Sequence, residues 1–229
     1  MARQFDNFYS HGAISFADFI NCVSSLYTGP DCIDEGTLRL LAEMLYRLSQ
    51  NKQFLAAQVA GGNKYTHHPR GLLDNDDLYV LYEQQQPFFG VYAQIWHPTL
   101  KRGKARGFNP PLRDYNFSAL TTNYFGPGCG SKLYQYEYRQ DLKQGEHCAL
   151  SFLQFYQFTS ENVLFTEASK DAIAQALPKS LSITISLRLE KNEHPCFIFD
   201  KSSKRVLGVI TDVNCEKAGV TSKMGLLEV

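Results

Sequence analysis

The stretch that decides the fold runs from Gly107 to Gly126 and reads GFNPPLRDYNFSALTTNYFG. Its second half, residues 117–125, is rich in aromatic and β-branched residues and is predicted to be a strand. Alternate residues of an extended chain face the same side, so Arg113 and Tyr115 are expected to project together. The GPG run at 126–128 indicates a sharp turn into the next strand.

This spacing resembles the first metal-binding motif of the cupins, G-x5-H-x-H-x3-E-x6-G. In that motif, two histidines separated by one residue direct their imidazoles at one ion inside a barrel. Here Arg113, Tyr115 and Ala119 stand where the motif has its two histidines and its glutamate. Arginine does not ligate a cation, alanine has no donor atom, and tyrosine is a poor ligand unless it is deprotonated. The resemblance therefore implies a cupin whose metal ligands have been replaced.

A longer resemblance, over about residues 90–189, is to a family of uncharacterised bacterial cupin-like proteins. Their first motif reads approximately HDHNFSFLTVGYFGPGY, and residues 113–129 here read RDYNFSALTTNYFGPGC. Their second motif resembles ASxDIHTQLPPExLSISLNL, and this chain has ASKDAIAQALP at 168–178 and LSITISL at 181–187. The third metal histidine of the family falls on Ile173. The resemblance implies that no metal cofactor is bound, and that the candidate pocket consists of the four replacing residues, Arg113, Tyr115, Ala119 and Ile173.

A guanidinium at position 113 would carry a fixed positive charge into the barrel, and a buried charge needs a partner. Three kinds of partner stay open: a carboxylate such as Glu137 or Glu167, the phenol of Tyr115, or a small anionic ligand. A structural ion pair in a former metal site is one interpretation, and ligand binding is the other. Polar or aromatic residues of neighbouring strands are weaker pocket candidates, namely Gln94, Tyr134 and Tyr136, although tyrosines on one strand face also pack across strands.

The first part of the chain has a helical pattern. Helices are predicted from Ser15 to Leu26, from near Asp34, and from Asn51 to Val59, because apolar residues recur there with helical spacing. The second of these helices carries four leucines on one face, which we call the leucine stripe: Leu38, Leu41, Leu45 and Leu48. Such a stripe is expected to be buried, either against its own chain or at a subunit interface.

From residue 78 onward apolar and polar residues alternate with the period of β-strands. Strands are predicted over residues 78–83, 89–96, 117–125, 132–139, 149–158, 162–166, 181–189, 196–199 and 205–210. Many short strands after helices favour a mainly β fold, the double-stranded β-helix or jelly roll of cupins, with an N-terminal α-helical region. The expected division is a helical region at 1–74 that packs on the barrel, a cupin-like β-barrel at 75–210, and a C-terminal tail at 211–229.

Charge and hydropathy limit the partners and the location. The 229 residues include 23 basic and 23 acidic side chains, so the formal net charge is zero. This balance gives no reason to expect a nucleic acid or a membrane as a partner. No apolar run reaches the roughly 20 residues of a membrane helix, and the N-terminus lacks an apolar signal segment, so a cytoplasmic location is expected.

Three functions stay open. The preferred one is a cupin-fold protein without a metal site that acts by binding, as a non-catalytic partner subunit of a metal-bearing cupin relative in small-molecule metabolism. Its partner would be a protein, in a homo- or hetero-oligomer. The second is an enzyme, either metal-independent, with Arg113 holding an anion and Tyr115 donating a proton, or a non-haem iron oxygenase with relocated ligands. The third is a small-molecule sensor or carrier that uses the barrel cavity.

Overall fold

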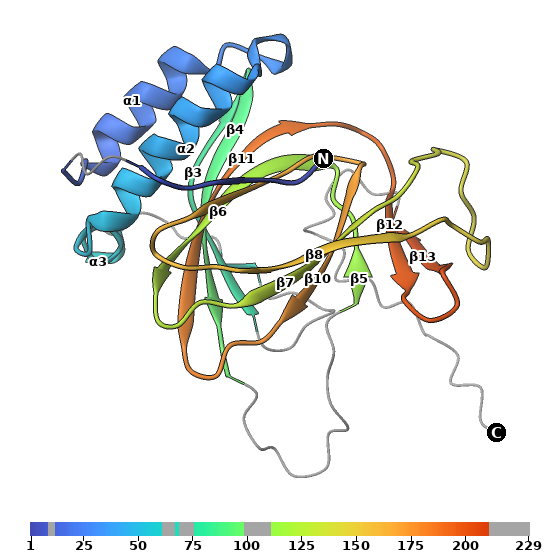
Figure 1. The fold of residues 1–229 in the computed structure, drawn as a ribbon. Coiled ribbons are helices and arrows are strands. Elements are labelled where there is room, and N and C mark those ends of the chain that lie inside the picture. Colours follow the sequence, from blue (N-terminus) through green and yellow to red (C-terminus); the bar gives the residue numbers. More distant parts are fainter. Residues whose placement is uncertain (9–11, 61–66, 69–75, 99–110, 211–229) are drawn as a thin grey trace.

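The computed structural model describes residues 1–8, 12–60, 67–68, 76–98 and 111–210, and its dominant feature is a pair of antiparallel sheets. One sheet has the strand order β1-β9-β6-β11-β4-β3-β2, and the other has the order β13-β12-β5-β10-β7-β8 (Figure 1). The strands are β1 (Arg3–Phe5), β2 (His67–His68), β3 (Asp76–Gln85), β4 (Phe88–Trp96), β5 (Leu112–Arg113), β6 (Phe117–Phe125), β7 (Gly130–Gln135), β8 (Ser151–Gln157), β9 (Val163–Thr166), β10 (Asp171–Ala176), β11 (Ser182–Lys191), β12 (Cys196–Asp200) and β13 (Arg205–Ile210).

The pairing of the central strands defines a jelly roll. Along the chain, β4 pairs with β11, β5 with β10, β6 with β9, and β7 with β8, all antiparallel. These four pairs alternate between the seven-stranded and the six-stranded sheet. Two sheets built from such nested antiparallel pairs are the double-stranded β-helix. The predicted fold class, a mainly β cupin-type jelly roll with N-terminal helices, is confirmed.

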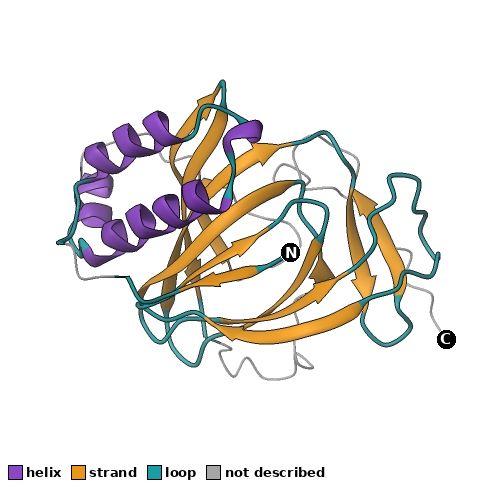
Figure 2. Ribbon diagram, turned by 45° about the horizontal axis from the view of Figure 1, so that its top comes forward, coloured by secondary structure: helices purple, strands orange, loops and turns teal. Residues whose placement is uncertain are grey.

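The helices cover one sheet. They are α1 (Phe16–Leu26), a 3-10 turn η1 (Pro30–Cys32), α2 (Glu35–Gln50) and α3 (Phe54–Ala60), and they lie together on the outer side of the seven-stranded sheet (Figure 2). The two longer helices, α1 and α2, have side-chain N-caps. The side chain of Ser15 accepts a hydrogen bond from the amide of Asp18, and the side chain of Asp34 accepts one from the amide of Thr37. These caps satisfy amides that a helix start otherwise leaves unpaired.

The leucine stripe packs on the barrel of its own chain. All four leucines are at most 2% exposed, and they share a core cluster with Leu120 of β6 and with Ile185 and Leu187 of β11. This settles the choice between core and interface for the stripe. The interpretation of the stripe as a subunit interface is therefore wrong, because its apolar face is already covered by the sheet.

Four short strands were not predicted. β1 pairs with β9, and β2 pairs with β3. β10 has the sequence DAIAQA, whose alanines have low strand propensity, and it is a strand because β5 and β7 pair with it on both sides. The two-residue strand β5 likewise lies between β10 and β12. Gly107, which opens the first motif, and the predicted tail at 211–229 lie outside the described residues.

The GPG turn gives a testable constraint. Gly128 has a φ of +77°, and a Cβ there would lie 2.0 Å from the carbonyl oxygen of Phe158. Gly145 has a similar φ of +85° with nothing within 4 Å of its Cβ position. Replacing Gly145 by alanine is expected to cost about 1–2 kcal/mol through the left-handed backbone alone. Gly128→Ala is expected to cost at least about 2 kcal/mol more, since backbone has to move.

Urea unfolding of both variants measures this difference in the free energy of unfolding. Equal losses in the two variants would contradict the close approach between the GPG turn and Phe158.

Candidate functional site

The inner and outer faces of the six-stranded sheet have different surroundings. Leu133 of β7 and Ile173 of β10 belong to an inner cluster that also contains Trp96 of β4 and Leu164 of β9, so this cluster fills the space between the two sheets. Ala172 and Ala174 of β10 belong to an outer cluster with Phe197 and Phe199 of β12, among others. Tyr115 packs against the inner cluster.

Arg113 lies on the inner face of its sheet. It is the register partner of Ile173 on one side and of Ile198 on the other, and directly opposed residues of antiparallel strands share a face. Its guanidinium carbon lies 4.6 Å from the ring centroid of Tyr115. The structure thus brings together three of the four predicted pocket residues, Arg113, Tyr115 and Ile173.

The contact between Arg113 and Tyr115 continues into a longer row. The ring centroids of Tyr115 and Phe117 are 5.1 Å apart. Arg188 of β11 lies next, with its guanidinium carbon 4.4 Å from the ring centroid of Phe117 and 3.9 Å from that of Tyr92 on β4. We call this set the arginine–aromatic row: Arg113, Tyr115, Phe117, Arg188 and Tyr92. It crosses the barrel from the six-stranded sheet to the seven-stranded one.

Small residues make room for the central arginine of the row. In the sheet register Arg188 lies between Gly90 of β4 and Ala119 of β6. A Cβ on Gly90 would lie 2.7 Å from the Tyr92 ring, so this ring folds back over the glycine. Ala119, the fourth predicted pocket residue, therefore lies beside Arg188, and the row connects it to Tyr115 and Arg113. The motif that the sequence resembles has a glutamate at the position of Ala119, and β11 places a guanidinium beside this alanine.

The row stabilises guanidinium groups inside the barrel. A cation over an aromatic face gains up to about 2 kcal/mol when it is desolvated, and arginine stacks on such faces better than lysine. Arg188 is 8% exposed and lies between two rings. Burial is the main reason that the pKa of Tyr92 is raised, and the hydroxyl of Tyr92 donates a 2.5 Å hydrogen bond to Glu83. Tyr92 therefore stays a neutral ring against which the cation packs.

Arg113 has one unsatisfied donor. Its Nε is buried and has no hydrogen-bond partner among the described residues. No ion pair joins Arg113 to Glu137, Glu167 or any other carboxylate in the described ranges. Glu167 instead binds the amino terminus of Met1 and the ammonium of Lys170. The structural ion pair considered from the sequence is therefore not formed by these two glutamates.

Asp114 points to the opposite side from its two neighbours. It is fully buried and accepts hydrogen bonds from the hydroxyl of Tyr136 and from the amide of Phe197. Burial raises its pKa from the usual 3.8 to about 6, although both hydrogen bonds and the charge of Arg113 oppose the shift. Asp114 thus fixes the chain between β5 and β6 to the outer cluster, while Arg113 and Tyr115 face inward.

The three weaker pocket candidates lie on different faces of the sheets. Tyr134 and Tyr136 pack in or against the outer cluster, and Tyr136 uses its hydroxyl on Asp114. Gln94 is the register partner of Thr184, whose hydroxyl accepts a 2.9 Å hydrogen bond from the Trp96 indole. The alternation along β4 puts Gln94 on the same inner face as Tyr92 and Trp96.

The donor set at the motif positions does not fit a metal ion. Arg113, Tyr115, Ala119 and Ile173 offer one phenol and one cationic group, and neither suits a divalent metal. Within the described residues there is also no group of three or more His, Cys, Asp or Glu side chains that is arranged to hold one. The arrangement can instead donate hydrogen bonds and positive charge to an anion.

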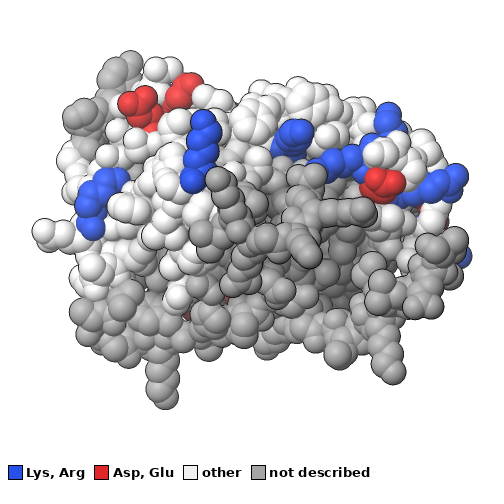
Figure 3. All heavy atoms as spheres, turned by 90° about the horizontal axis from the view of Figure 1, so that it is seen from below, with Lys and Arg blue, Asp and Glu red and all other residues white. Residues whose placement is uncertain are grey.

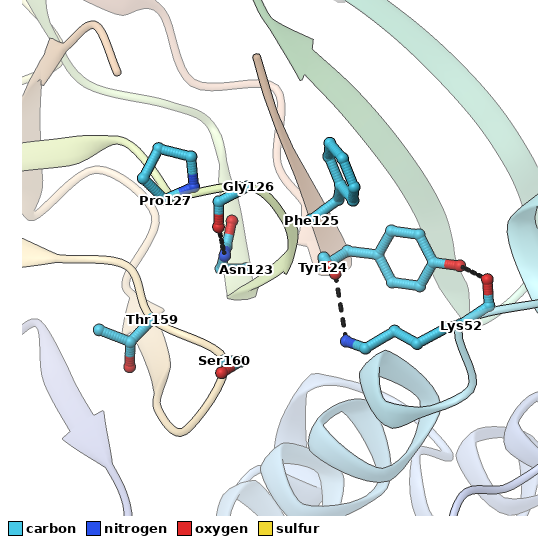
Figure 4. A pocket seen from close by; sticks show the side chains of 8 residues that line it. All are labelled: Lys52, Asn123, Tyr124, Phe125, Gly126, Pro127, Thr159 and Ser160. Atoms are coloured by element: carbon cyan, nitrogen blue, oxygen red, sulfur yellow. Dashed lines mark hydrogen bonds between the residues drawn. The ribbon is translucent and has the colours of Figure 1, made fainter. Parts of the chain in front are cut away.

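A separate pocket of about 430 Å³ lies at the far end of β6, at the GPG turn (Figure 4). Lys52 is the charged residue of its lining, and its ammonium already donates to the carbonyls of Ser49 and Tyr124, at 2.7 and 3.2 Å. The hydroxyl of Tyr124 returns a 2.7 Å hydrogen bond to the Lys52 carbonyl. This lysine therefore joins the end of α2 to β6, and its ammonium is already engaged by two backbone carbonyls.

The sequence did not single out Arg188, Tyr92 or Phe117. The signal for Arg188 was present, because LSITISLRL at 181–189 alternates and places the arginine on the polar face with Thr184 and Ser186. The polar face of that strand lines the barrel interior, whereas its apolar face packs under the helices. Phe117 and Tyr92 gave no distinct signal, since aromatic residues are common in strands.

The strand order defines a cupin-type jelly roll, and guanidinium groups and aromatic rings lie on its inner face. No protein-family model matches the sequence, and no curated protein sequence does. Solved structures that are similar to the chain include an RmlC-like cupin protein from Ralstonia eutropha JMP134, with 11% identity, a TM-score of 0.37, and coverage of 65% of this chain and 74% of that one.

Two further structures are similar to the chain. One describes the DMSP lyases RdDddP and RnDddQII, with 11% identity, a TM-score of 0.33, and coverage of 80% of this chain and 77% of that one. The other is a cupin-2 domain from Rhodospirillum rubrum, with 9% identity, a TM-score of 0.33, and coverage of 56% of this chain and 68% of that one. The fold assignment rests on the strand order of the two sheets.

Charged side chains of the described residues lie along the upper part of the face that Figure 3 presents. Several lysine and arginine side chains lie near one another on the right, with an acidic group among them, and other acidic groups lie at the upper left (Figure 3). In the part of the chain that the structure describes, no helix is long and apolar enough to cross a membrane.

The raised pKa of Asp114 predicts a pH dependence of stability. Between pH 4 and 6 the folded protein holds a proton on Asp114 that the unfolded chain has lost. The stability from this group is therefore complete below its unfolded pKa and is lost as the pH rises through the folded pKa of about 6. Relative to Asp114→Asn, the wild-type free energy of unfolding should fall by up to about 3 kcal/mol from pH 4 to 7. Urea titrations of both proteins across this range measure their free energies of unfolding. A wild-type free energy of unfolding that rises with pH relative to that of Asp114→Asn would refute the prediction.

Proposed function

We propose that this chain is a cupin-fold protein that acts by binding, with a small anionic ligand held at Arg113 in the barrel where metal-bearing cupins hold an ion. The buried Nε of Arg113, which has no hydrogen-bond partner among the described residues, is the observation that carries the proposal. A buried donor left unsatisfied costs about 1–3 kcal/mol or more when the group is charged. A carboxylate or phosphate oxygen supplies the missing acceptor for this donor, with a charge opposite to that of the guanidinium.

The surroundings of Arg113 favour an anion over a neutral ligand. Tyr115 holds the guanidinium on one face, and the apolar side chains of Ile173 and Ile198 flank it in the sheet. Arg188 adds a second positive charge further along the same row. Charges in such a poorly solvated setting act strongly on a ligand of opposite sign. A carboxylate also matches the planar fork of a guanidinium with two parallel hydrogen bonds.

The second part of the proposal is association with another barrel, either a second copy or a metal-bearing cupin relative to which this chain is a non-catalytic subunit. Two aromatic side chains support it, because Phe152 and Phe155 of β8 are 55% and 52% exposed. Large apolar side chains that are exposed side by side are more typical of a contact surface than of a free one. A cytoplasmic location remains part of the proposal.

Ligand binding is tested by thermal unfolding and calorimetry with three anions of different charge and shape: acetate, malonate and phosphate. Acetamide and matched sodium chloride serve as neutral and ionic controls. At a ligand concentration 100 times the Kd, binding stabilises the folded state by about 2.7 kcal/mol, and Tm should rise by several degrees. Arg113→Met should abolish the rise, because the methionine keeps apolar volume but removes the charge.

Arg39→Met is the matched control, since Arg39 is an exposed residue on α2 outside the barrel, and this variant should respond as the wild type does. A wild-type protein that no anion stabilises beyond the two controls, or an Arg113→Met protein that keeps the response, would exclude Arg113 as the anion site.

A further inference from the structure

The six-stranded sheet ends at β8, whose outer edge pairs with no strand among the described residues. β8 pairs with β7 on one side, and within the described ranges no strand pairs with its other side. Its seven residues read SFLQFYQ and include no charged residue and no proline. Natural proteins usually protect a sheet edge with charges, proline, a β-bulge or a covering segment, because free backbone donors and acceptors attract another strand. β8 carries neither charge nor proline, and its one irregularity, at Leu153, leaves regular pairing on both sides of it.

A register shift places the two exposed phenylalanines on one face. Phe155 lies opposite Lys132 and Phe152 lies opposite Tyr134, with an irregularity between Leu133 and Tyr134. Lys132 and Tyr134 are two apart on β7 and share a face, so the two phenylalanines share it as well. The aromatic pair therefore lies on the outer face at the free edge, while Tyr156 faces the inner cluster.

The positions of both rings are fixed by neighbours within the chain. Phe152 contacts Tyr134 edge to face, with ring centroids 5.4 Å apart. Phe155 lies across Gly130, where a Cβ would be 2.4 Å from its ring. Rings that are held in this way lose little side-chain freedom when a partner covers them.

We propose that β8 pairs antiparallel with β8 of a second copy of this chain, which extends the six-stranded sheet across a two-fold axis. An axis between Leu153 and Gln154 sets Phe152 of each copy opposite Phe155 of the other, on the same outer face. The same register sets Ser151 opposite Tyr156. A two-fold interface must be self-complementary, and this strand satisfies that condition without bringing like charges together.

This surface specifies the associating part of the proposed function and rests on it. It is independent of the anion site, because Arg113 and Ile173 lie on the inner face of the sheet and the phenylalanines lie on the outer one. Failure of the dimer therefore leaves anion binding at Arg113 as a separate result, and failure of anion binding leaves the dimer.

The test is sedimentation velocity with light scattering, on the full chain at about 1–100 µM. The wild type should be a dimer, and the double variant Phe152→Glu and Phe155→Glu should raise its dissociation constant about 100-fold or more, because each loss occurs twice per dimer. Phe125→Glu is the matched control, since Phe125 is also 55% exposed but lies at the end of β6, and it should leave the dimer intact.

Circular dichroism of each variant checks that the barrel is folded. Gln154→Pro is a second variant, which removes a backbone amide of β8 without adding charge. In the wild type, amide exchange in β8 should slow as the concentration rises. A wild-type monomer at 100 µM, a dimer unaffected by the double variant, or a dimer lost with Phe125→Glu would overturn the proposal.

Discussion

A guanidinium inside a protein barrel needs something to replace its lost hydration, and in this protein aromatic rings take that place. Arg188 lies between Phe117 and Tyr92, and Arg113 lies against Tyr115. Each contact supplies part of the attraction that water gave. The inner face of the barrel therefore carries two guanidinium groups beside aromatic rings.

The position of this row follows from what packs on the outer face of each of the two sheets. The helices cover the seven-stranded sheet, so the apolar face of β11 turns outward and its polar face, with Arg188, turns into the barrel. On the six-stranded sheet the outer cluster, which contains Phe197, covers the outer face, and buried Asp114 accepts a hydrogen bond from the amide of Phe197. Because Asp114 is held outward, its neighbours Arg113 and Tyr115 are directed inward. The same alternation that directs histidines at a metal in the cupin motif thus directs a guanidinium and a phenol here.

The sequence predicts the fold well and the candidate site in part. The alternation in residues 181–189 and the leucine stripe predicted a barrel with helices, and the motif spacing predicted that Arg113 and Ile173 lie together. The strand at Ile173 itself was missed, because alanine-rich β10 is a strand only through its two neighbours. Arg188 was missed since its role depends on Ala119 lying opposite it, a strand pairing that no local pattern encodes.

Metal analysis tests whether the barrel positions of the cupin ligands carry a cationic and aromatic row in place of an ion. The protein is purified alone from cells supplied with iron, zinc and manganese and analysed by inductively coupled plasma mass spectrometry. We expect a metal content well below about 0.1 ion per chain, whereas a bound metal centre gives about one. A wild-type stoichiometry near one would contradict this expectation.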